Sequence, residues 1–110
     1  MDYQQILVEK KDAVAVISLN RPEKLNAWTY RMQAELMDAI TRSNDDPSVG
    51  AMIMTGSGRG FCAGADMSAG EDTFAKQDAK TFSAAGVDPP AWQVRKPVIA
   101  AMNGHAVGIG

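Results

Sequence analysis

The feature that most constrains the fold is an apolar segment, residues 13–19, in which both alternating sets of side chains are apolar. Such a segment is typical of a strand that is covered on both faces, so other layers must pack on the sheet that contains it. A shorter extended run, residues 6–8, precedes it, and the polar residues 9–12 lie between the two. This spacing predicts a hairpin with its turn at residues 9–12.

The rest of the chain alternates helical and extended patterns. Met32, Leu36 and Ile40 recur every four residues, with Ala39 beside them, which predicts an amphipathic helix over about residues 30–43. The polar residues of this segment take its other side: Arg31, Glu35, Asp38 and Arg42. Apolar runs at residues 49–54 and 98–102 predict two more strands. This order predicts an α/β fold.

A second helix is predicted over about residues 71–85, because Ser68 and Glu71 have the spacing of a capping box. The remaining large apolar side chains are expected in the core, since such residues are usually buried. They are Trp28, Trp92, Met32, Met37, Met52 and Met54.

Length and composition exclude several classes of protein. A chain of 110 residues has room for one domain at most, and no apolar run reaches the roughly 18 residues that a membrane helix needs. The single cysteine, Cys62, forms no internal disulfide, and the first residues have no secretory-signal pattern. We therefore expect a reducing, cytoplasmic compartment. The net charge of −2 offers no electrostatic basis for binding nucleic acid.

The glycine-rich segments admit more than one interpretation. Residues 58–63 fit the relaxed dinucleotide fingerprint G-x-G-x-x-A after a strand, so a nicotinamide-dinucleotide-binding domain is a remote alternative. The turns at residues 63–65 and 108–110 can instead each aim a backbone N–H at one point, which makes an oxyanion hole for a thioester. Two tight turns without a ligand are the simplest interpretation of the same glycines.

Three segments resemble, in order and spacing, successive signatures of the crotonase superfamily, the enoyl-CoA hydratase/isomerase proteins. They are residues 20–27 (NRPEKLNA), 60–66 (GFCAGAD) and 96–110 (KPVIAAMNGHAVGIG). The resemblance implies a spiral of ββα units and an acyl-CoA thioester substrate, with no metal and no separate cofactor. Because family members are more than twice as long, it also implies that residues 1–110 are the N-terminal part of one such domain, incomplete at its C-terminal side.

The resemblance also implies roles for individual residues. Ala65 and Ile109 would donate the backbone N–H groups of the oxyanion hole. Many members have glycine where Ile109 stands, but the backbone N–H is the group that acts, so isoleucine can serve at a negative φ. The coenzyme A moiety and the thioester channel would be lined by a second set: Lys24, Leu25, Ala27, Ala63, Asp66 and Met67.

General acid–base groups are the part that these residues do not supply. Family hydratases hold and activate water with two glutamates, and both positions fall beyond residue 110. The candidates within the chain have more ordinary interpretations: Asp66 as a helix cap, Glu71 as a capping-box partner, His105 as a surface residue and Cys62 as a packing residue.

The resemblance leads us to expect a complete protein that hydrates an enoyl-CoA or isomerises its double bond. It also implies a homo-oligomer, a trimer or hexamer. The alternative from another class is a non-catalytic piece that only binds or contributes a folded part.

Overall fold

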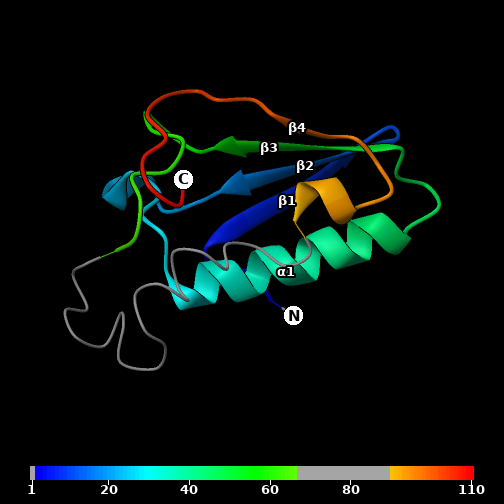
Figure 1. Cartoon of the computed structure of the whole chain (residues 1–110), viewed down its shortest axis with the longest axis horizontal. Helices are drawn as coiled ribbons and strands as arrows, with labels where there is room; N and C mark the ends of the chain where they lie inside the picture. The colour runs from blue at the N-terminus through cyan, green and yellow to red at the C-terminus, as the bar shows by residue number, and fades with distance from the viewer. Residues whose placement is uncertain (1, 67–89) are drawn as a thin grey trace.

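A computed structural model describes residues 2–66 and 90–110, which form a four-stranded mixed sheet flanked by a helix (Figure 1). The strands stand in chain order: β1 (Ile6–Lys11), β2 (Val14–Leu19), β3 (Ala51–Gly56) and β4 (Val98–Ala100). The helix is α1 (Tyr30–Asp45), and the connections contain the 3₁₀ turns η1 (Pro22–Lys24) and η2 (Ala91–Gln93). In this described part, no helix is both long and apolar enough to span a bilayer. The predicted helix over residues 71–85 lies outside the described residues.

The predicted hairpin is confirmed, but its first strand is longer than predicted. β1 pairs antiparallel with β2, and residues 9–11 pair with residues 14–16 instead of forming the turn. Residues 9–11 are exposed on the outer strand, where polar side chains stay in water, so pairing requires no burial of charge. The turn is thereby reduced to Asp12, which has a φ of 54°, and Ala13.

The other strand pairs are parallel, and both strands differ slightly from the predicted ranges. β3 begins two residues late, because Ala13 O accepts the N–H of Gly50 (2.6 Å) and places Ala51 opposite Val14. β4 ends two residues early, because the Asn103 side chain takes over the next ladder position and accepts the Gly56 N–H at 3.0 Å. Both shifts come from partners that are distant in the sequence.

The core lies between the sheet and α1. Ala15, Ile17 and Leu19 alternate along β2 and are buried, and they face the predicted apolar side of α1, which is also buried: Met32, Leu36, Ala39 and Ile40. The opposite set on β2 is only half-buried in residues 2–66 and 90–110, so cover on both faces is not seen in this part.

The expected core residues divide into three groups. Trp28, Met32 and Met52 are buried, as predicted, and Met37 and Met54 are half-buried. Trp92 is 84% exposed, so its prediction as a core residue is wrong. It lies in η2, and a three-residue turn has no continuous face to pack against a sheet.

Glu35 corrects the predicted polar face of α1, because its side chain is only 1% exposed. Its Oε1 accepts the backbone N–H groups of Gln4 (3.0 Å) and Gln5 (2.8 Å), and its Oε2 pairs with Arg31 Nε at 2.6 Å. The segment before β1 thus lies against this side of the helix. These charge-assisted hydrogen bonds replace the hydrogen bonds to water that the carboxylate loses on burial.

Candidate active site

Three loops leave the carboxyl ends of β2, β3 and β4: residues 20–29, 57–66 and 101–110. Because the three strands are parallel, these loops meet at one edge of the sheet, and the C-terminal segment passes beside the loop after β3 (Figure 1). Ligands of open α/β sheets bind outside the carboxyl ends of the strands. The same loops contain most of the three segments that resemble the crotonase signatures.

Asn26 joins the first two loops. Its side chain is fully buried and its φ is 57°, a conformation that asparagine tolerates better than most residues. Its Oδ1 accepts the Arg21 N–H at 2.7 Å, and its Nδ2 donates to the carbonyls of Ser57 (2.9 Å) and Gly60 (2.8 Å). Asn26 is a residue without a role predicted from the sequence, although it lies inside the first signature segment.

Ala65 lies in a short parallel bridge with Trp28. Trp28 donates its N–H to Gly64 O at 2.7 Å and accepts the Asp66 N–H at 2.7 Å. In a parallel ladder the middle residue directs its own N–H to the opposite side. Ala65 therefore aims its N–H away from Trp28, and no hydrogen bond joins that group to another residue of the described part.

The C-terminal segment lies against the same loop. Cys62 and Ala106 form a second parallel bridge, in which Cys62 donates to His105 O (3.0 Å) and accepts the Val107 N–H (3.0 Å). Gly64 has a φ of 100°, and a Cβ there would lie 3.2 Å from Val107 O, so a side chain would be strained. Residues 62–65 and 105–110 are thus close neighbours.

Ile109, the second predicted oxyanion residue, belongs to this C-terminal segment. It is half-buried and packs against the core cluster. Within residues 2–66 and 90–110 its N–H, like that of Ala65, has no hydrogen-bond acceptor. The fold therefore brings the two predicted donors into adjacent segments at one edge of the sheet.

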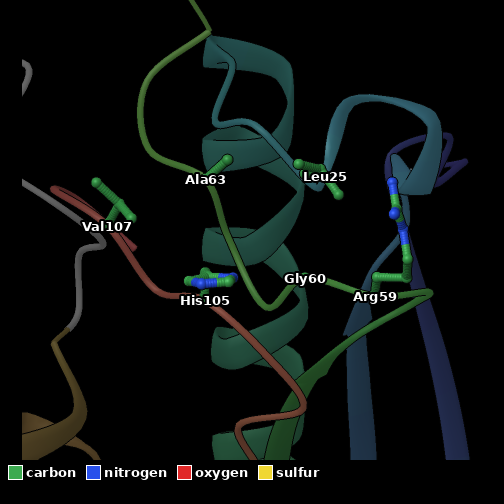
Figure 2. A pocket seen from close by; sticks show the side chains of 6 residues that line it. All are labelled: Leu25, Arg59, Gly60, Ala63, His105 and Val107. Carbon is green, nitrogen blue, oxygen red and sulfur yellow. The ribbon is translucent and has the colours of Figure 1, made fainter.

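A cavity of about 480 Å³ lies between these loops. Figure 2 shows its lining residues: Leu25, Arg59, Gly60, Ala63, His105 and Val107. Two of them, Leu25 and Ala63, were predicted to line the coenzyme A channel, and the Ala63 N–H donates to Leu25 O at 3.0 Å. Arg59 and His105 were not assigned to the site. The one sequence feature that could have pointed to either residue is the position of Arg59 inside the glycine loop.

The other predicted binding residues lie around this cavity or outside the described part. Lys24 is exposed in η1, next to Leu25, and Ala27 is half-buried with its carbonyl bonded to Arg21 at 2.7 Å. Asp66 pairs with Arg21 at 2.9 Å and lines neither this cavity nor the next. Met67, like the Ser68–Glu71 capping box, lies outside the described residues.

A second cavity, of about 300 Å³, adjoins Ile109. Most of its lining is apolar: Leu19, Trp28, Met54, Phe61, Cys62, Ala91, Val98, Ala100, Met102, Ile109 and Gly110. Cys62 is buried, and this burial raises the pKa of its thiol, which therefore stays protonated near neutral pH. The prediction that Cys62 is a packing residue is confirmed.

Titratable groups are sparse at both cavities. Among the residues that the structure describes, no carboxylate lines either one. Residues 2–66 and 90–110 also contain no cluster of three or more His, Cys, Asp and Glu side chains that could hold a metal ion. The described loops present mostly apolar cavity walls, with Ile109 in the wall of the smaller cavity, and two backbone N–H groups, of Ala65 and Ile109, that have no acceptor in the described part. Such an arrangement can bind and polarise a carbonyl oxygen.

Known proteins match this chain over nearly its whole length. The family profile described as enoyl-CoA hydratase/isomerase matches residues 9–110. A probable enoyl-CoA hydratase of Mycobacterium tuberculosis is 44% identical over 111 residues, which cover 100% of this chain and 42% of that protein. A crotonyl-CoA hydratase of Syntrophomonas wolfei is 42% identical, with 100% of this chain and 43% of that protein covered. The chain thus spans about two fifths of the length of these relatives.

Solved structures agree on the fold. The crystal structure of a probable enoyl-CoA hydratase/isomerase from Mycobacterium abscessus superposes with a TM-score of 0.81 and 43% identity, covering 94% of this chain and 40% of that one. An enoyl-CoA hydratase from Bacillus anthracis gives a TM-score of 0.80 at 32% identity, covering 97% of this chain and 43% of that one. The described part therefore has the crotonase fold.

The dinucleotide-binding alternative is overturned by the same findings. Residues 61–66 form bridges with Trp28 and Ala106, where the fingerprint requires the first turn of a helix. The two solved structures described above are a probable enoyl-CoA hydratase/isomerase and an enoyl-CoA hydratase. From its signature segments, its fold and its relatives, the chain belongs to the enoyl-CoA hydratase/isomerase family.

Proposed function

We propose that this chain is the N-terminal part of an enoyl-CoA hydratase or isomerase, and that it binds an acyl-CoA thioester and polarises its carbonyl. The observation that carries the proposal is the pair of backbone N–H groups of Ala65 and Ile109. They lie in neighbouring segments at the edge where the carboxyl ends of β2, β3 and β4 meet, and neither has an acceptor within the described part. Family membership supports the same assignment.

These two donors would act on the thioester oxygen. Adding water across the double bond, or moving the bond, passes negative charge onto that oxygen as an enolate forms. Fixed N–H groups stabilise this charge more than they stabilise the neutral carbonyl, so they lower the barrier. We assign the acid–base groups to the two glutamates that the family resemblance implies, whose positions fall beyond residue 110.

The two cavities suit the two ends of the substrate. The larger one, with Leu25 and Ala63 in its wall, would take the coenzyme A moiety, and Lys24 and Arg59 would face its phosphates as positive charges. Ala27, Asp66 and Met67 complete the proposed binding set. The smaller apolar cavity beside Ile109 would take the acyl chain.

The test uses the full-length protein and crotonyl-CoA. Hydration removes the conjugated double bond, so the ultraviolet absorbance of the thioester falls, and turnover of order 10 s⁻¹ is expected for a typical enzyme. A 3-enoyl-CoA supplies the isomerase assay, in which absorbance rises as conjugation forms. Thioester binding without either reaction would favour the non-catalytic alternative. Absence of thioester binding would overturn the proposal.

A further inference from the structure

A partly buried ion pair involves Asp66, the residue that follows Ala65. Arg21 Nη1 is 2.9 Å from Asp66 Oδ2, and the two side chains are only 14% and 11% exposed. The same Nη1 donates to Ala27 O at 2.7 Å, and the Arg21 backbone N–H donates to Asn26 Oδ1 at 2.7 Å. Arg21 is therefore fastened to its own loop at both ends. Asp66 is the residue that it holds from the other loop.

Stability alone does not account for this pair. Removing two charges from water costs about as much as their attraction returns, so apolar residues of similar size are often equally stable or more stable. Four other ion pairs of the described part each have at least one side chain that is about half exposed or more: Glu9–Lys11, Arg31–Glu35, Asp38–Arg42 and Asp45–Arg95. Among these pairs, Arg21–Asp66 is the one in which neither side chain is more than 14% exposed.

The geometry points to what the pair does. Ala65 lies between Gly64, whose carbonyl accepts the Trp28 N–H, and Asp66, whose N–H donates to Trp28 O. Those two bonds hold the backbone of the bridge, and they leave the Asp66 side chain to be held by another group. The ion pair fastens the Asp66 side chain to the loop that also carries Trp28, so the peptide on either side of Ala65 has one orientation.

We propose that Arg21 and Asp66 are positioning residues that hold the Ala65 N–H in the direction of the thioester oxygen. This inference rests on the function proposed above. Misplacing a reacting or stabilising group by about 1 Å can cost roughly 100-fold in rate. Deleting one oxyanion donor costs roughly 10²–10³-fold. Loss of the ion pair should therefore lower kcat by about 10- to 100-fold while the donor itself remains.

The experiment replaces both charges together in the full-length enzyme, as Arg21→Met with Asp66→Leu. This double variant leaves no unpaired buried charge and keeps every backbone N–H, so urea denaturation should show a folded protein. The direct probe is a CoA thioester with an aryl group conjugated to its double bond, whose absorbance shifts to longer wavelength when its carbonyl is polarised. The double variant should bind this probe with a much smaller red shift than wild type and show the reduced kcat.

Two further variants keep the result interpretable. Arg95→Met with Asp45→Leu removes an exposed pair far from Ala65 in the sequence, and it should retain wild-type kcat and red shift. Arg21→Lys keeps the charges balanced but replaces the planar guanidinium that reaches both Asp66 and Ala27, so it should lower kcat and the red shift even if the double variant does not fold.

The outcomes separate this inference from the function on which it rests. If wild type binds the probe with no red shift and shows no turnover, the proposed function and this inference both fail. If wild type is active and shifts the probe, but the folded double variant or Arg21→Lys keeps kcat within threefold and the full shift, only the inference fails. Reduced kcat and red shift in a folded variant support it.

Discussion

Replacing Ala65 with proline removes the one backbone N–H on which the proposed mechanism depends most. Within the described part this N–H bonds to no other residue, so its loss breaks no bond of the bridge to Trp28. The neighbouring N–H of Asp66, in contrast, donates to Trp28 O at 2.7 Å. The effect should therefore fall on catalysis, as a loss of roughly 10²–10³ in kcat, or about 3–4 kcal/mol of transition-state stabilisation.

The matched control is Ala65→Val, which keeps the N–H and adds bulk at the same position. Proline also fixes φ and restricts Gly64 before it, so circular dichroism and coenzyme A affinity are measured for both variants in the full-length enzyme. Hydration of crotonyl-CoA then gives kcat. If the folded proline variant keeps kcat within threefold of the valine variant, Ala65 is not an oxyanion donor and the reasoning is refuted.

Three further predictions concern the fold that supports the site. Glu35→Ala removes the acceptor of two backbone N–H groups, so it should lower the free energy of unfolding, measured by urea denaturation, by about 3 kcal/mol. Glu35→Gln should lower it by less than half of that amount. Equal losses in the two variants would contradict this account. Gly64→Ala places a side chain on a backbone with a φ of 100°, so it should lower the free energy of unfolding by about 1–3 kcal/mol. Gly50→Ala is the control, because its Cβ would make ordinary contacts at 3.6 Å, and it should lower that free energy by about 0.5 kcal/mol or less. Similar values for the two variants would refute the strain at Gly64. Burial, together with the hydrogen bond to Asp38, raises the pKa of Tyr3 from 10.0 to about 12, so its stabilising contribution is complete below pH 10 and is lost as the pH rises towards 12. The absorbance titration of wild type minus that of Tyr3→Phe should show this midpoint, and a midpoint near 10 would exclude it.

Local patterns in the sequence determined the elements and their order. The four-residue spacing of Met32, Leu36 and Ile40 predicts α1, because a helix that packs on one face repeats its apolar residues with its own period. The continuous apolar run at residues 13–19 predicts β2. The three signature segments identify the family and point to the Ala65 and Ile109 turns. Short stretches of chain contain these signals completely, so no knowledge of distant contacts is required.

The tertiary structure decided which residues distant in the sequence lie against each other. Glu35 has the spacing of a solvent-facing residue, and it is buried because the backbone of Gln4 and Gln5 lies over it. Arg21 and Asp66 are separated by the whole of α1 and β3, yet they form a partly buried ion pair next to Ala65. Periodicity describes one element at a time, whereas the burial of a charge and the direction of an N–H depend on which other segment the fold places beside it.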